Sequence, residues 1–101
     1  MQITTQNELN SLIQQDFTIL IASTKTCTVC THTKGMVARM LADTPLEYHN
    51  VDIDELPVFR GDHLVFTVPT VLVFSQGKEL FRSSRFIDYG ALTKLINRYL
   101  N

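Results

Sequence analysis

The sequence predicts an α/β fold in which helices flank a central mixed sheet of four or five strands. Short β-branched runs alternate with helical patterns through the first half of the chain. Two further strands then flank a turn at 75–78, and an amphipathic helix closes the chain. The expected order is therefore β-α-β-α-β-α-β-β-α. We expect residues 1–101 to form a single domain, because this length is close to the commonest domain size.

The N-terminal third is expected to hold two strands around a short helix. Residues 1–4 are the first strand. The segment that follows has the form of a capping box, in which the Thr5 hydroxyl and the Glu8 carboxylate accept from early helix donors. Apolar residues then recur at helical spacing, so the helix runs to about Gln15. Residues 17–22 are almost continuously apolar and rich in β-branched residues, which is typical of a central strand covered on both faces.

A second helix is expected over residues 28–42, where apolar residues repeat at helical spacing until Asp43-Thr44-Pro45 ends it. Gly35 lies inside this helix and costs it about 1 kcal/mol relative to alanine. Gly35 is either a glycine that the helix tolerates or the site of a bend or a close packing contact, and we favour the second. Residues 47–52 read as the next strand.

The C-terminal half is expected to hold a short helix, a hairpin and a last helix. Asp54 is predicted to cap a helix that reaches about Asp62. Residues 70–74 form an apolar, β-branched run, and residues 79–82 follow it after the turn Ser75-Gln76-Gly77-Lys78, which indicates a β-hairpin. Asp88 is predicted to cap the last helix.

Composition and charge exclude several classes of partner. The formal net charge is −1 and the chain has no cluster of Lys or Arg, so we expect no nucleic-acid partner. The first residues lack the basic start and apolar core of a signal peptide, and no apolar run is long enough for a bilayer span. We therefore expect a cytoplasmic protein without a membrane partner.

Cys27 and Cys30 are the only cysteines, and they lie where an apolar strand gives way to a helix. Two thiols separated by two residues can close a small disulfide ring at a helix start. The first thiol there faces unsatisfied backbone donors, which stabilise a thiolate. In a reducing compartment such a pair is more often catalytic or metal-binding than structural. The arrangement suits thiol–disulfide exchange.

Three features in order resemble the thioredoxin family over nearly the whole chain. Cys27-Thr28-Val29-Cys30 follows a buried strand and opens a helix, Thr67-Val68-Pro69-Thr70 precedes a later strand, and Gly77 lies in the hairpin turn. A CxxC alone is a moderate signal, because zinc sites also use it. Joined to the later Val-Pro-Thr in this element order, it is a strong one. The resemblance implies a thioredoxin-like fold and a dithiol oxidoreductase that reduces protein disulfides.

The resemblance also implies a role for each site residue. Cys27 is the nucleophile that attacks a substrate disulfide, and Cys30 resolves the mixed disulfide. Pro69 matches a cis proline that packs against the active disulfide and leaves backbone free to pair with substrate. The substrate-binding residues are then Thr67, Val68 and Pro69. The residues expected to tune the redox balance are Thr26, Thr28 and Val29.

The chain departs from the thioredoxin pattern at several positions. It has no Trp, and Thr26 replaces the usual aromatic before the first cysteine. Other replacements are Ile21 for a buried Asp, Asn50 for its Lys partner, Gly35 for a helix-bending proline, and Arg85 for a loop glycine near the substrate groove. Cys30 must then lose its proton to water, to substrate or to another group.

Nearby charged and titratable residues offer little to replace that lost acceptor. His32 is expected to be a solvated surface residue, because residues two apart on a helix point to different faces. Lys25 either adds positive potential near Cys27 or points to solvent. His49 and His63 are expected to be structural or surface residues.

The resemblance implies no bound cofactor and no metal, with the Cys27–Cys30 disulfide itself as the redox-active group. The expected partners are protein disulfide substrates and a separate reductase that supplies electrons. We expect the protein to be a monomer.

Three alternatives compete with a thioredoxin-like reductase. A glutaredoxin-like reductase shares the fold, although the chain lacks the usual aromatic by the CxxC and a C-terminal Gly-Gly, since Gly90 stands alone. A binding module that kept the fold and lost efficient turnover would explain the missing Asp, Lys and Trp. A metal site would need four ligands, which two thiols supply only if a dimer shares two CxxC pairs.

Overall fold

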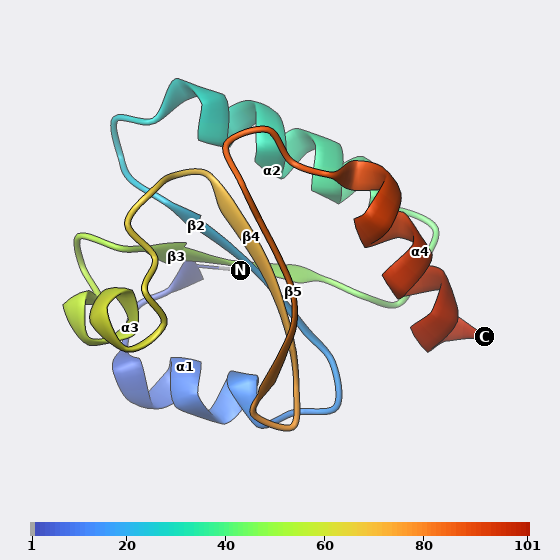
Figure 1. The fold of residues 1–101 in the computed structure, drawn as a ribbon, viewed down its shortest axis with the longest axis horizontal. Coiled ribbons are helices and arrows are strands. Elements are labelled where there is room, and N and C mark those ends of the chain that lie inside the picture. The colour runs from blue at the N-terminus through green and yellow to red at the C-terminus, as the bar shows by residue number, and fades with distance from the viewer. Residues whose placement is uncertain (1) are drawn as a thin grey trace.

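The computed structural model describes residues 2–101, and its elements follow the predicted order (Figure 1). The five strands are β1 (Gln2–Ile3), β2 (Thr18–Ser23), β3 (Tyr48–Asp52), β4 (Thr70–Ser75) and β5 (Lys78–Ser84). The four helices are α1 (Gln6–Ile13), α2 (Thr28–Leu41), α3 (Pro57–Asp62) and α4 (Tyr89–Leu100). The predicted first strand began at Met1, which lies outside the described residues. None of the helices within residues 2–101 is long and apolar enough to cross a membrane.

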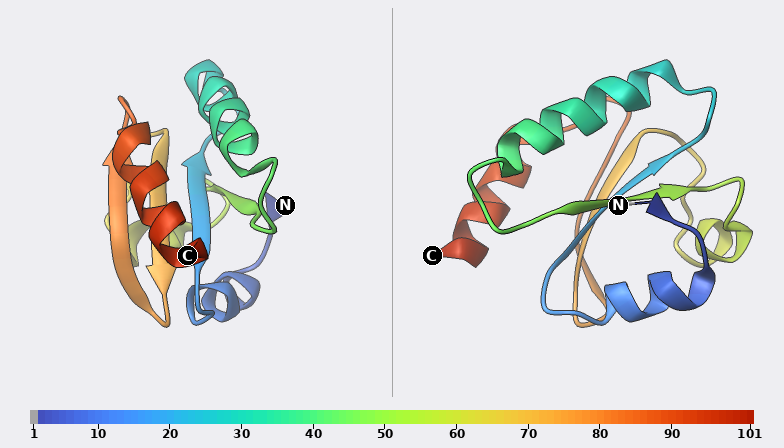
Figure 2. Two further views of the ribbon diagram at one scale, coloured as in Figure 1. Left: turned by 90° about the vertical axis from the view of Figure 1, so that its right-hand side faces the viewer. Right: turned by 180° about the vertical axis from the view of Figure 1, so that it is seen from behind.

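The five strands form one mixed sheet in the order β1-β3-β2-β4-β5 (Figures 1 and 2). β3 pairs in parallel with β1 and β2, whereas β4 pairs antiparallel with β2 and β5. Ile21 in the central strand lies opposite Asn50 on one side and Val71 on the other. The predicted α/β class with a mixed, helix-flanked sheet is confirmed.

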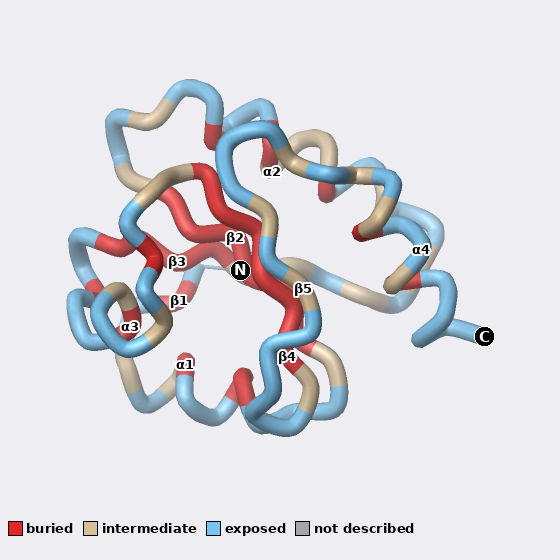
Figure 3. Tube along the Cα trace, viewed as in Figure 1, coloured by how far each residue is buried: buried red, intermediate tan, exposed pale blue. Residues whose placement is uncertain are grey.

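Each face of the sheet carries its own apolar core, because successive side chains of a strand point to opposite faces. Helices α1 and α3 cover one face and pack on Leu20, Leu72 and Phe74. Helices α2 and α4 cover the other face and pack on Ile21 and Val71. Figure 3 shows β2 buried along its length, as the apolar run at 17–22 predicted for a central strand. β4 is buried in the same way except at Ser75.

Helix α1 begins as predicted at the Thr5 cap, whose hydroxyl accepts from the Glu8 backbone N–H at 3.1 Å. The Glu8 carboxylate, however, accepts from the N–H of Thr4, one residue before the cap. The helix also ends at Ile13, two residues earlier than expected. The reason is the hairpin turn, where Gly77 N–H donates to the Ile13 carbonyl at 2.9 Å and so takes up a helix-end acceptor.

The predicted cap of α3 is wrong. Asp54 lies two residues too early, and its N–H donates to the Asp52 carboxylate at 2.9 Å in the turn after β3. Pro57 is the first helical residue, so the cap position falls on Leu56, which makes no side-chain capping bond. Asp88 does cap α4, accepting from the Ala91 N–H at 3.0 Å.

The expected close packing at Gly35 is also wrong. A side-chain carbon there would meet only the Arg39 guanidinium, at 3.7 Å, which is ordinary van der Waals contact. Helix α2 continues through this residue from Thr28 to Leu41 without interruption.

Candidate active site

Cys27 and Cys30 are joined by a disulfide at the start of α2, with their Cα atoms 5.3 Å apart. Cys27 is the N-cap of the helix, and its sulfur accepts from the Cys30 backbone N–H at 3.1 Å. Its own N–H donates to the Thr24 carbonyl, which closes the turn between β2 and α2. The first sulfur therefore occupies the position where orphan helix donors and the helix dipole favour an anion.

The two cysteines differ sharply in exposure. Cys27 is half-buried, whereas Cys30 is only 1% exposed. Between them Thr28 and Val29 both face solvent, and Val29 is 55% exposed. A molecule that approaches the disulfide from solvent therefore meets Cys27 first.

The Val68–Pro69 peptide bond is cis, and this segment lies beside the start of α2. Two hydrogen bonds hold the Val68–Pro69 segment in position. The Pro69 carbonyl accepts from the Arg85 N–H at 2.8 Å, and the Thr70 hydroxyl donates to the Thr67 carbonyl at 2.6 Å. The loops before β4 and after β5 are thus tied together at the end of the sheet where α2 begins (Figure 1).

A pocket of about 230 Å³ joins the cysteine segment to these two loops. Its lining residues are Val29, Val68, Pro69, Arg85 and Phe86. An adjoining pocket of about 310 Å³ shares three of them and extends along α2 to His32. The fold therefore brings two of the predicted substrate-binding residues against the inter-cysteine segment. Thr67, Thr26 and Thr28 do not line either pocket.

Phe86 is a site residue that the sequence reasoning missed. The residue is 92% exposed although its side chain is a large apolar group. The available signal was an aromatic residue in the loop directly before the last helix. That signal became specific only when the fold placed this loop against Val29.

Lys25 forms an ion pair with Glu55. Its ammonium lies 2.8 Å from the Glu55 carboxylate, and the side chain is 80% exposed. The hydrogen bond and the charge of Glu55 raise the pKa of Lys25. Lys25 therefore points toward Glu55 rather than adding an unpaired charge beside Cys27. His32 is exposed on α2, as expected.

The positions of the missing Asp and Lys hold uncharged groups. Ile21 is fully buried in the apolar core beneath α2. Asn50 is 8% exposed, accepts from the Ser23 hydroxyl at 2.7 Å and donates to the Gln2 side chain. The amide of Asn50 is thus occupied by neutral partners.

The remaining histidines have structural surroundings. His63 lies between two aromatic rings, 5.0 Å from that of Phe59 and 5.2 Å from that of Phe74. His49 is half-buried in β3, and burial lowers its pKa. Within residues 2–101 no group of three or more His, Cys, Asp or Glu side chains is placed to hold a metal ion.

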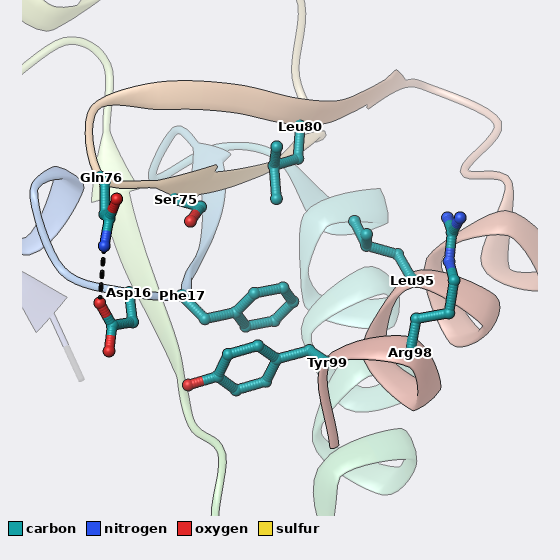
Figure 4. A pocket seen from close by; sticks show the side chains of 8 residues that line it. All are labelled: Asp16, Phe17, Ser75, Gln76, Leu80, Leu95, Arg98 and Tyr99. Carbon is teal, nitrogen blue, oxygen red and sulfur yellow. Dashed lines mark hydrogen bonds between the residues drawn. The ribbon is translucent and has the colours of Figure 1, made fainter. Parts of the chain in front are cut away.

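A separate, open pocket of about 530 Å³ lies at the opposite end of β4, between the hairpin turn and α4 (Figure 4). The Phe17 and Tyr99 rings are stacked there with centroids 4.2 Å apart, and Gln76 donates to Asp16 at 3.1 Å. None of the predicted site residues lines it.

The curated relatives that the chain matches are named as thioredoxins or thioredoxin-like proteins. No family model matches the chain. It is 29% identical over 90 residues to the thioredoxin-like protein YdfQ of Bacillus subtilis, covering 88% of this chain and 80% of that protein. It is 26% identical over 100 residues to a thioredoxin of Chlamydia trachomatis, covering 98% of both.

Solved structures show the same fold. A mutant thioredoxin from Halobacterium salinarum superposes with a TM-score of 0.84 at 22% identity, over 100% of this chain and 90% of that one. The oxidised thioredoxin from Plasmodium falciparum superposes with a TM-score of 0.81 at 23% identity, over 97% of this chain and 95% of that one.

Proposed function

Since this chain is a thioredoxin-like protein with a CxxC pair, and hence a thiol–disulfide oxidoreductase, we propose that it acts as a reductant of protein disulfides. Cys27 is the nucleophile and Cys30 the resolving thiol. The observation that carries this assignment is the asymmetry of the pair. Cys27 is accessible and accepts a backbone N–H, whereas Cys30 is buried one turn into the helix.

The reaction starts from the reduced dithiol. The Cys27 thiolate attacks one sulfur of the substrate disulfide, the substrate S–S bond breaks, and the other substrate sulfur leaves as a thiolate. The Cys30 thiolate then attacks Cys27, which releases the second substrate thiolate and forms the Cys27–Cys30 disulfide seen in the structure. Two electrons pass from the dithiol to the substrate, and two protons accompany them.

The proton of Cys30 has no carboxylate acceptor at position 21, where an isoleucine fills the core. We assign its acceptor to the first departing substrate thiolate, directly or through water. The transfer passes the proton from one sulfur to another, so the protons of the reaction balance without a separate base.

The groove beside the disulfide supports the binding step. Val29 and the cis Val68–Pro69 segment line one pocket, so a substrate strand that crosses it passes close to Cys27. Extended peptides commonly bind such backbone edges by adding main-chain hydrogen bonds. The protein would work as a monomer in the cytoplasm, where a separate reductase returns electrons to the disulfide.

Trapping variants test this function. Cys30→Ser should accumulate mixed disulfides with protein substrates, because the resolving thiol is gone, and Cys27→Ser should accumulate none. The wild type should also reduce the disulfides of insulin with dithiothreitol as electron donor. A chain that captures the same partners with and without Cys27, and that fails to reduce insulin, would be a binding module instead.

A further inference from the structure

The groove beside the disulfide carries a positive charge that thiol chemistry does not use. Arg85 lines both adjoining pockets, next to Val29 and Phe86. Its side chain is exposed, and no ion pair or hydrogen bond engages its guanidinium within residues 2–101. This cation is available to a bound molecule.

Two other cations of the chain, Lys25 and Arg82, differ from Arg85 in being paired. Lys25 binds Glu55, and Arg82 binds Glu79 at 2.7 Å. The acidic residue nearest to Arg85 in sequence is Asp88, whose carboxylate caps α4 by accepting from the Ala91 N–H. Asp88 is therefore engaged with the helix end. The guanidinium of Arg85 is therefore free to form an ion pair with a bound molecule.

The backbone of Arg85 is held in place. Its φ is +63°, in the left-handed region that favours glycine, and its N–H donates to the Pro69 carbonyl at 2.8 Å. The base of the side chain is thus fixed beside the proline segment, while the long stem lets the guanidinium reach a bound strand. A glycine here would satisfy the backbone equally well and present no charge.

An apolar surface adjoins this cation. Phe86 is 92% exposed and Val29 is 55% exposed, and both line the pocket that Arg85 shares. Large apolar side chains left this open commonly mark a site of interaction. A partner that covers both features would place an apolar side chain on Phe86 and Val29 and a carboxylate on Arg85.

We propose that Arg85 and Phe86 select the substrate, favouring disulfides whose cysteine is flanked by an acidic residue and an apolar residue. This inference rests on the proposed reductase function and adds its substrate class. An exposed ion pair changes a rate or an affinity by about two- to fivefold at low salt, and added salt screens it. The preference is therefore modest in size and sensitive to ionic strength.

A series of peptide disulfides tests the charge preference. Three symmetrical disulfides would carry Leu near the cysteine and differ only in flanking Glu, Gln or Lys. Pre-reduced protein is mixed with each in a single turnover, and released peptide thiol is measured by chromatography after acid quench. Each rate constant is divided by that of dithiothreitol with the same peptide, which removes the intrinsic reactivity of the disulfide.

The wild type should prefer the Glu peptide over the Lys peptide by about fivefold at low salt, and this ratio should shrink in about 0.5 M salt. Arg85→Gln should bring the ratio close to one and Arg85→Glu should invert it. Arg98→Gln removes an equal charge at the far end of α4 and should keep the wild-type ratio. The wild type should reduce the Leu peptides faster than matched peptides that carry Ser in place of Leu. Phe86→Ser should lower this Leu-to-Ser ratio of rate constants about threefold.

Equal normalised rates for all three peptides in the wild type, or an unchanged ratio in Arg85→Gln, would overturn the selectivity while the reductase function stands. Failure of the wild type to reduce any peptide disulfide would overturn the reductase function, and the selectivity with it. Because the readout is a ratio within each variant, a general change in Cys27 reactivity does not alter it.

Discussion

The Cys27 sulfur accepts a hydrogen bond from the Cys30 backbone N–H at 3.1 Å, so the first cysteine of the pair is also the N-cap of α2. One atom thus serves the start of the helix and the redox bond. The same N–H remains available to the sulfur when the disulfide is reduced. This double role links the stability of α2 to the reactivity of Cys27.

Without the disulfide, the cap should still contribute to stability. A serine hydroxyl at position 27 can accept the Cys30 N–H, whereas alanine cannot. In a Cys30→Ser background, Cys27→Ala should therefore lower the free energy of unfolding by about 1 kcal/mol relative to Cys27→Ser. Urea denaturation measures the difference. Thr5→Ala removes the side-chain cap of α1, and the stability that it loses shows how much one such cap contributes in this protein. Equal stabilities of the two position-27 variants would show that a side-chain acceptor at this position does not stabilise the start of α2.

The reduced Cys27 thiol should have a pKa below that of a free thiol. Its sulfur faces a backbone donor at the positive end of a helix dipole, and both favour the thiolate. The rate of alkylation by iodoacetamide should rise at lower pH than for a model thiol. The Cys30→Ser variant is used, so that one thiol reacts. A profile that matches the free thiol would contradict the proposed activation of Cys27.

Periodic segments could be predicted from the sequence because their signal is local. The short β-branched apolar run of β2 indicates a buried strand, and the apolar stripe of α2 repeats at helical spacing. The cap of α3 could not, because aspartate is favoured in turns as well as at helix starts, and after β3 the Asp52 carboxylate forms a turn by accepting from the Asp54 N–H. The difference depends on where Pro57 begins the helix.

Some features of the candidate site could likewise be predicted from local sequence, and others depend on contacts between distant segments. The CxxC segment is contiguous, so its position before α2 was readable from the sequence alone. The contact between Val29 and the Val68–Pro69 segment joins residues some forty positions apart, and only the resemblance to a family suggested it. The partner of Lys25 could not be predicted, because Glu55 approaches it through the turn after β3.

Gly77 should be the glycine least able to accept a side chain. Its φ is +85°, and an added carbon would lie 3.0 Å from the Gln14 side chain. That side chain is flexible and can move, so the backbone conformation dominates the cost. Gly77→Ala should lower the free energy of unfolding by about 1 kcal/mol. Gly61→Ala is the matched control, because nothing lies within 4 Å of the added carbon there and alanine favours the helix. Similar losses in both variants would contradict this account of the turn.

His49 should make stability depend on pH. Burial lowers its pKa from the ordinary value of 6.5, which Glu47 and Glu8 partly oppose, and its buried Nδ1 has no hydrogen-bond partner within residues 2–101. The unfolded chain therefore binds a proton at a higher pH than the folded chain does. The stability contributed by neutral His49 is complete above the unfolded pKa and is lost as pH falls below it, until the folded pKa is passed. Wild type should consequently lose more stability between about pH 8 and about pH 5 than His49→Gln does. Thermal unfolding of both proteins across this range measures the difference, and parallel curves would show that His49 does not carry the linkage.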